Sequence, residues 1–159
     1  MSAAIPARIR DVLVARLQTI RQIAGFNTDL GLAVHRGRGA YALQDLATGP
    51  AVNLYATGEE FQTAMGNQQR LALNITVEAF SAFDPDADAV ADELLADIKA
   101  AVLSAAQPTL TDATGPLGQR LEYVSSAVDL PNPGEQMVSV AVTLRVPYFE
   151  RYGAPTLTA

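Results

Sequence analysis

The stretch from Arg70 to Leu103 changes its hydrophobic period from two to about 3.6 residues, which predicts a strand followed directly by a helix. In its first part every second residue is apolar, and the residues between are mostly polar: Leu71, Leu73, Ile75, Val77 and Ala79 form the apolar set. In its second part the apolar residues recur at helical spacing: Val90, Ala91, Leu94, Leu95, Ile98 and Val102. Each element therefore has one apolar face, and neither is stable until that face is buried.

The segment 84–86, Asp-Pro-Asp, lies where the period changes. An Asp side chain can accept hydrogen bonds from the free N–H groups of a first helical turn, and proline suits the first helical position. Together with Asp88 the segment also has the spacing that opens a calcium loop. However, Ala89 and Leu95 stand where such a loop needs glycine and glutamate. We therefore expect a helix start and no metal site.

Hydrophobic periodicity and breaker residues define the remaining elements. The first helix has an apolar stripe formed by Ile9, Val12, Leu13, Leu17 and Ile20. The last strand alternates as clearly as the central one, with these residues on its inward face: Val138, Val140, Val142, Leu144 and Val146. In chain order, the other expected bounds are a helix over 5–24, a short strand over 32–36, an irregular segment over 37–50, a strand over 51–56, a loop over 107–118, a strand over 119–128 and a turn over 130–134.

This order predicts an α+β fold, a mainly antiparallel β-sheet with two helices packed on one face. A chain of 159 residues is expected to form a single domain, 1–159, with a core of its own. From about Phe149 onward, Gly153 and Pro155 predict an extended C-terminal tail.

The segment Thr57–Gln69 separates two expected strands and is longer than an ordinary hairpin loop. It is polar, yet it contains Phe61 and Met65. One interpretation is an arm that binds another protein or subunit, because exposed apolar side chains on a long hairpin suit that purpose. The other is that the two strands extend further and that both residues pack locally.

Composition limits the classes of function. The net charge of −6 argues against binding nucleic acid through broad phosphate neutralisation. The chain has no cysteine, which excludes disulfides and thiolate metal sites, and His35 is its single histidine. It also lacks a nucleophile motif or a phosphate-binding glycine loop, so we expect no enzyme activity and no cofactor. Arg8 and Arg10 interrupt any apolar segment near the start, so we expect neither a signal peptide nor a membrane partner.

Basic residues are concentrated in the first quarter of the chain: Arg8, Arg10, Arg16, Arg21, Arg36 and Arg38. Two interpretations remain open. They form a solvated helix face, or they form a surface for a subunit or partner, where arginine is favoured over lysine.

Three stretches together resemble a known family. They are RIRDVLVARLQTIRQIAGFNTDLG with VHRGR shortly after it, the strand and helix RLALNITVEAFSAFDPDADAVADELLADIKAAVL, and the closing VSVAVTLRVPYFERYGAP. In this layout the chain resembles the tail terminator, or tail completion, proteins of long-tailed bacteriophages and prophages. The resemblance covers nearly the whole chain in order and rests on the layout, without a single diagnostic motif.

The resemblance implies a structural subunit of the virion tail or neck, assembled in the host bacterial cytoplasm. In that family the subunits form a homo-oligomeric ring, expected to be a hexamer, on the head-proximal end of the tail tube. The ring contacts the tail tube protein, stops polymerisation and presents a joining surface to a head–tail connector or stopper protein. Genomic DNA passes through the channel without sequence-specific binding, and no catalysis is needed.

By position in this layout, the resemblance also implies which residues contact other subunits or partners. The expected interface residues in the hairpin are Phe61 and Met65, with Glu59 and Glu60 beside them. Those near or in the irregular segment are Arg36, Arg38 and Tyr41, and those toward the C-terminus are Tyr148, Phe149 and Tyr152.

Two alternatives remain. The first is another neck component, a head–tail connector or stopper, which shares this size and composition. The second is a small-ligand-binding α+β domain, which predicts a pocket with converging polar groups.

Overall fold

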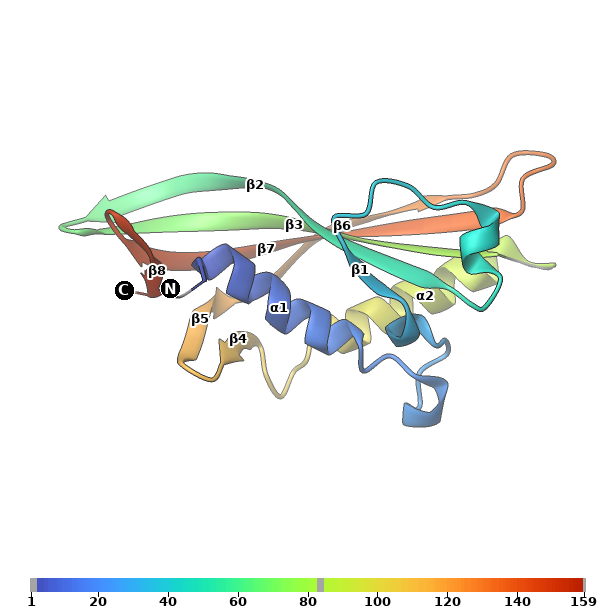
Figure 1. The fold of residues 1–159 in the computed structure, drawn as a ribbon, viewed down its shortest axis with the longest axis horizontal. Coiled ribbons are helices and arrows are strands. Elements are labelled where there is room, and N and C mark those ends of the chain that lie inside the picture. Colours follow the sequence, from blue (N-terminus) through green and yellow to red (C-terminus); the bar gives the residue numbers. More distant parts are fainter. Residues whose placement is uncertain (1–2, 83–84, 159) are drawn as a thin grey trace.

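The computed structural model describes residues 3–82 and 85–158 of the chain. It is an elongated molecule built on a twisted sheet, with both α-helices below that sheet in Figure 1. The elements in chain order are α1 (Ile5–Leu17), η1 (Gln22–Ala24), η2 (Leu30–Leu32), β1 (Val34–Arg36), η3 (Leu43–Leu46), β2 (Ala51–Met65), β3 (Gln68–Ala82), α2 (Ala87–Val102), β4 (Thr109–Asp112), β5 (Gly115–Arg120), β6 (Glu122–Asp129), β7 (Met137–Arg151) and β8 (Ala154–Thr158).

The main sheet has the strand order β1-β2-β3-β7-β6, and β8 pairs with the end of β7 beyond β6. Only the short β1–β2 pair is parallel; the other pairs are antiparallel. A separate hairpin is formed by β4 and β5. The fold is therefore α+β, with a mainly antiparallel sheet and two helices on one face, and the sequence-based prediction is confirmed.

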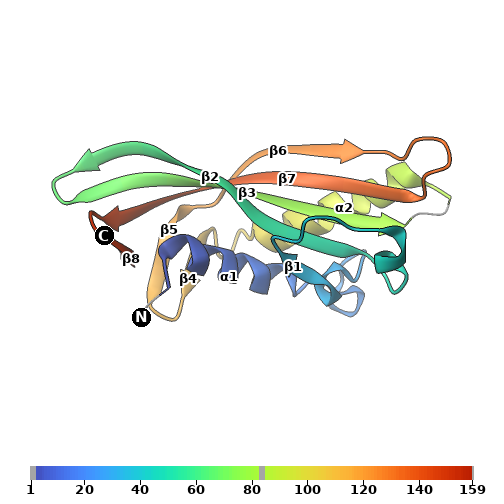
Figure 2. The same ribbon diagram turned by 45° about the horizontal axis from the view of Figure 1, so that its top comes forward.

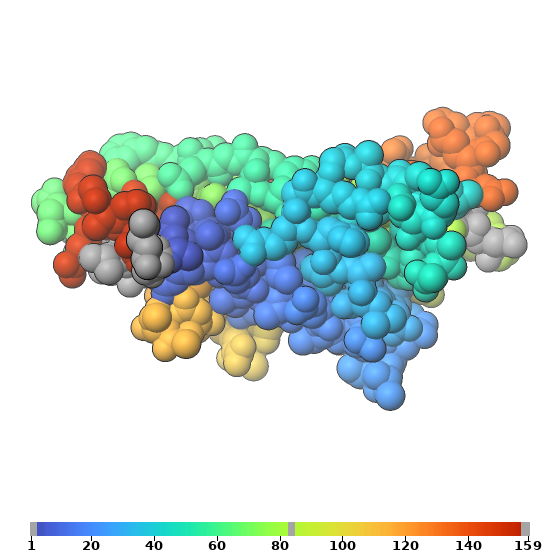
Figure 3. Space-filling view, in the orientation of Figure 1, coloured from blue at the N-terminus to red at the C-terminus, as the bar shows by residue number. Residues whose placement is uncertain are grey.

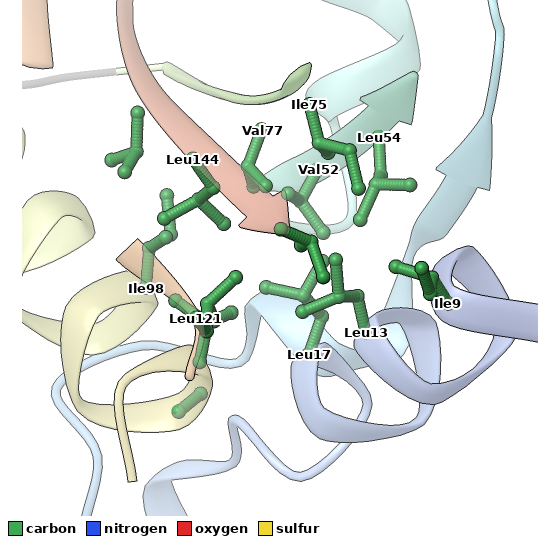
Figure 4. Close-up of a cluster of buried hydrophobic side chains, with 14 of the residues drawn as sticks. Ile9, Leu13, Leu17, Val52, Leu54, Ile75, Val77, Ile98, Leu121 and Leu144 are labelled. Atoms are coloured by element: carbon green, nitrogen blue, oxygen red, sulfur yellow. The ribbon is translucent and has the colours of Figure 1, made fainter. Parts of the chain in front are cut away.

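The core lies between the two helices and the alternating faces of the long strands, as Figure 4 shows. Ile75, Val77 and Ala79 of β3 are each 0% exposed, and the register places them opposite Leu144, Val142 and Val140 of β7. From α1, the residues Ile9, Leu13 and Leu17 enter the same cluster, and Ile98 of α2 joins them. The period-two and helical patterns in the sequence therefore correctly identified the buried faces.

The start of α2 agrees with the sequence, with a small shift. Asp86 is the capping residue, and its carboxylate accepts a hydrogen bond of 3.1 Å from the backbone N–H of Ala89. Pro85 precedes that cap and does not occupy the first turn. Asp84, which belongs to the same predicted cap, lies outside the described residues.

The first helix is shorter than the expected 5–24, because it ends at Leu17. Gly31 packs closely against the residues that follow Leu17. A side-chain carbon at Gly31 would lie 2.6 Å from the carbonyl oxygen of Gln18 and 2.7 Å from that of Ile20. The N–H of Gly31 donates to the same Ile20 oxygen at 2.9 Å. After the helix, two backbone segments therefore pack against each other, and Ile20 remains buried.

The loop expected over Thr57–Gln69 does not exist, because β2 and β3 extend through it and meet at a short turn, Gly66–Asn67. Gly66 has a φ of 62°, which suits glycine at a tight turn. The alternative that the strands simply extend is thus correct. The accompanying prediction that both apolar residues pack locally is wrong, because Phe61 is 63% exposed and Met65 is 77% exposed.

Two further segments differ from the sequence-based prediction. The loop expected over 107–118 contains the β4–β5 hairpin, whose Leu110 and Leu117 are buried in the main core. From Phe149 onward, where we expected an extended tail, β7 continues to Arg151 and β8 folds back to pair with it. In both places a short strand is stabilised by backbone pairing with its neighbour in the chain, which hydrophobic periodicity does not reveal.

Candidate functional site

Three strands continue together beyond the helices and form a projecting arm. We define the arm as residues 57–65 of β2, 68–74 of β3 and 145–151 of β7, with the β3 segment paired to both of the others. Figures 1 and 2 show this ribbon leaving the body of the molecule on the side of the N-terminal helix. In the space-filling view it extends past that helix, at the left of Figure 3. The pairing makes the arm a firm element, in contrast to a loose loop.

One face of the arm is partly covered by the body. Phe61, Leu71 and Tyr148 lie on one rung of this face, and the last two are 5% and 0% exposed. Phe61 is 63% exposed, so the apolar surface of the rung continues onto an uncovered edge. Such a side chain is available for contact with another molecule.

The buried Tyr148 has a single polar outlet, a hydrogen bond from its hydroxyl to the carboxylate of Glu59. Burial and this bond to an anion both raise the pKa of Tyr148 well above its usual range. The sequence predicts both residues as interface residues, and within the chain they bind each other. Phe149, on the next rung, is half-buried and lies opposite Arg70.

The opposite face of the arm carries charged side chains together with the buried Ala72 and Pro147. Arg145 forms an ion pair of 3.1 Å with Glu60, which is a predicted interface residue. Glu150 lies two residues after Tyr148 and so returns to the partly covered face, where it is only 9% exposed and accepts a bond of 2.6 Å from Gln69. The β2–β3 register shifts between Ala56 and Gly58 and between Phe61 and Thr63, and such bulges add local twist to a strand.

At the end of the arm, the β2–β3 turn and the β7–β8 turn are joined by a backbone hydrogen bond. The backbone N–H of Tyr152, after β7, donates a bond of 2.9 Å to the carbonyl oxygen of Asn67, in the β2–β3 turn. Met65 and Arg151 lie on the last rung of the ribbon. We call Met65, Gly66, Asn67, Arg151 and Tyr152 the arm tip. Met65 is 77% exposed and Tyr152 is 52% exposed, and Arg151 is exposed too.

The remaining predicted interface residues do not belong to the arm. Arg38 pairs with Asp45 at 2.9 Å and lies 4.4 Å above the ring of Tyr41. Tyr41 in turn stacks on Phe80 with 4.6 Å between ring centroids, and burial raises its pKa. Arg36 pairs with Asp11 of α1. The predicted set therefore divides into an arm group and a group beside β1.

Several of the clustered arginines hold the molecule together, which neither sequence interpretation anticipated. Arg8 contacts Asp112 through two bonds of 2.7 and 3.1 Å and so joins α1 to the β4–β5 hairpin. This guanidinium lowers the pKa of the Asp112 carboxyl. Arg16 donates to the carbonyl oxygens of Val102 and Gln107, each at 2.7 Å. One carbonyl oxygen at the end of α2, that of Val102, is thereby satisfied.

The described part of the chain contains no group of three or more His, Cys, Asp or Glu side chains placed to hold a metal ion. Within the same part, no helix combines the length and the apolar character that crossing a membrane requires.

Comparisons with known proteins identify no relative by sequence. No protein-family model matches the chain, and no curated protein matches it. Among solved structures, a chain of the virion of a native gene transfer agent particle is similar at a TM-score of 0.49 and 14% identity. The match covers 91% of this chain and 90% of that one. A second solved chain is similar at a TM-score of 0.45 and 16% identity. That match covers 89% of this chain and 94% of the other. Both TM-scores lie below 0.5.

Proposed function

We propose that this protein is a structural subunit of a phage-type tail that forms a ring on the head-proximal end of the tail tube. The observation that carries the proposal is the arm, a paired ribbon that exposes Phe61 midway along its length and Met65 and Tyr152 at its tip. Large apolar side chains at the end of a firm projection are typical of surfaces that bind protein. The sequence layout resembles that of tail terminator proteins, and this resemblance implies the partners of the surface: the tail tube protein and a head–tail connector or stopper protein.

The proposed mechanism is mechanical. A contact between two different surfaces of the same chain repeats around an axis, and it closes into a ring if the rotation permits. One side of the ring occupies the position of a further layer of tube subunits. The other side lacks a tube-like surface and so stops polymerisation, and there it meets a connector or stopper protein. No bond is made or broken.

The charge of the chain suits a channel that DNA passes through. With a net charge of −6, the protein does not neutralise phosphates over a broad surface. DNA is thus able to slide past the ring without sequence-specific binding. The six-fold symmetry is part of the proposal by resemblance alone.

The test has two stages. Light scattering at several concentrations measures the mass of the purified protein, and electron microscopy then examines cognate tail tubes mixed with it. We expect a hexamer, or a monomer that forms rings on one tube end. A protein that remains monomeric and ignores tubes overturns the proposal. Binding to connector rings without affinity for tubes favours the alternative neck component.

A matched pair of variants tests the arm itself. Phe61→Ser removes an exposed apolar side chain from the arm, and Val128→Ser removes one of 45% exposure from β6. We expect Phe61→Ser to weaken tube capping at least about tenfold, as for a contact at the centre of an interface. Val128→Ser is expected to cap as the parent does. Equal effects of both changes contradict a specific role for the arm.

A further inference from the structure

A cavity of about 380 Å³ lies at the end of the molecule opposite the arm. Its walls come from the segment 22–33, the segment 45–50 and the beginning of α2. The first two segments are the blue and teal regions at the right of Figure 3. We call this cavity the end pocket and define it by Gln22, Asp29, Leu32, Asp45, Val90 and Glu93. At roughly 30 Å³ per water molecule, it has room for several side-chain groups.

The end pocket combines an apolar rim with carboxylates. Leu32 is 62% exposed, and Ile23, next to the lining residue Gln22, is 96% exposed. None of the lining residues is basic. Asp29 and Asp45 are paired with arginines of the same chain, at 3.9 and 2.9 Å. Among the described residues, Glu93 has no ion-pair partner, so its carboxylate is available to a cation from outside.

The arm tip is complementary to the end pocket, because it combines exposed apolar side chains with a positive charge. Met65 and Tyr152 supply exposed apolar surface, and Arg151 adds a cation that forms no ion pair within the described part of the chain. Tyrosine and arginine are enriched at the energetic centres of protein interfaces. The tip is also held in shape by the bond from Tyr152 to Asn67. Little ordering is therefore needed when it binds.

The tip and the pocket of one molecule cannot meet. They lie at opposite ends of β2 and β3, strands of 15 residues each that are paired along their length. An arm that bent back would break this ladder of hydrogen bonds. The complementary surfaces can therefore be joined only between two copies.

We infer that the end pocket of one copy receives the arm tip of a second copy, with Met65 and Tyr152 against Leu32 and with Arg151 beside Glu93. This contact joins two different surfaces of the same chain, so it is heterologous and leads to a ring or an open chain. The inference deepens the proposed function, on which it rests, by naming the two surfaces that build the ring.

Disulfide trapping tests the inference directly, because the chain has no cysteine of its own. Met65→Cys and Leu32→Cys are made in separate molecules, mixed at the concentration used for assembly and oxidised. A control mixture pairs Met65→Cys with Val124→Cys, which is 50% exposed on β6. We expect the Met65–Leu32 mixture to give mainly the crossed dimer, identified by mass spectrometry. Equal yields in both mixtures, or only Met65–Met65 dimers, overturn the inference.

Charge exchange provides a second, independent readout. Arg151→Glu and Glu93→Arg are each expected to weaken self-association by about two- to fivefold, the scale of an exposed ion pair. The double variant, with both changes in every copy, is expected to recover the affinity of the parent. Arg120→Glu, an exposed arginine of β5 outside both surfaces, serves as the control. Failure of the double variant to recover contradicts the pairing of Arg151 with Glu93.

The outcomes separate this inference from the proposed function. Crossed disulfides in a protein that never caps tail tubes support the contact and reject the tail role. Rings that cap tubes without crossed disulfides support the tail role and reject the contact. A small molecule that fills the end pocket without any effect on self-association also rejects the contact.

Discussion

The hydroxyl of Tyr148 donates a hydrogen bond to the carboxylate of Glu59, and this bond spans β3 at the base of the arm. Tyr148 is fully buried, whereas Glu59 is exposed. The pair therefore links the buried rung of the arm to its free edge strand, β2. A ring buried among Leu71 and its neighbours gives the tyrosine its packing, and Glu59 satisfies its one polar group.

Removing the hydroxyl tests this link. Tyr148→Phe keeps the ring and leaves Glu59 without its donor, so we expect the free energy of unfolding in urea to fall by about 1–2 kcal/mol. Glu59→Gln retains an oxygen that accepts the hydroxyl and is expected to cost less. A larger loss for Glu59→Gln than for Tyr148→Phe contradicts this account.

The same pair predicts a dependence of stability on alkaline pH. The folded pKa of Tyr148 is raised above its unfolded value, which is about 10. Between the two values the unfolded chain binds fewer protons than the folded one, so the free energy of unfolding falls as pH rises above about 10. Below that pH the stabilisation is fully present. Urea titrations at a series of alkaline pH values should show a shallower fall for Tyr148→Phe, and identical slopes contradict the prediction.

Asp97 is expected to be the most sensitive carboxylate of α2. It is 2% exposed and accepts four hydrogen bonds from the loop before η2: two from Asn27, at 3.0 and 2.9 Å, and two from Thr28, both at 2.7 Å. Asp97→Ala leaves these donors unpaired and should lower the free energy of unfolding by about 3 kcal/mol. The exposed Asp92 on the same helix is the control, and its change to Ala should cost no more than about 0.5 kcal/mol. Comparable losses at both positions contradict the role of Asp97.

Gly31→Ala tests the close packing of the segment that follows the first helix. Gly31→Ala places a carbon against the backbone carbonyl oxygens of Gln18 and Ile20, at 2.6 and 2.7 Å, and backbone cannot rotate away as a side chain does. We expect a loss of about 1–3 kcal/mol from this overpacking, measured by thermal or urea unfolding. Gly39→Ala meets nothing within 4 Å and is the matched control, expected to be close to neutral.

The ion pair of Asp112 with Arg8 predicts that the free energy of unfolding falls at acid pH. The Arg8 guanidinium lowers its folded pKa, so this pair contributes stability above the unfolded pKa of about 3.9, and the contribution is lost as pH falls below it. Both side chains are partly exposed, at 13% and 22%, so we expect Asp112→Asn to cost only about 1 kcal/mol at neutral pH. The difference from the parent should shrink as the pH falls to about 2. A difference that is independent of pH contradicts this assignment.

The sequence by itself determined the elements whose pattern is local. The alternation around Ile75 and the helical stripe around Ile98 each reflect one apolar face, and burial of such a face is decided by residues close together in the chain. From these elements the α+β class followed, and so did the placing of both helices on one face of the sheet.

Only the tertiary structure decided how far the strands extend. Residues 57–65 of β2 are mostly polar and bury no face, so their local pattern is that of a loop. They form a strand because β3 supplies backbone partners along its whole length. The β4–β5 hairpin and β8 are likewise defined by backbone pairing with the neighbouring strand, which periodicity does not record.

The candidate site divides in the same way. Phe61, Met65 and Tyr152 stood out in the sequence as apolar residues in polar or irregular surroundings. That Met65, Arg151 and Tyr152 meet at one tip depends on the β3–β7 register and on one backbone bond to Asn67. The sequence determined which faces must be buried, because hydrophobic patterns are local. The tertiary structure decided which exposed residues lie together, because backbone pairing joins segments that are far apart in the chain.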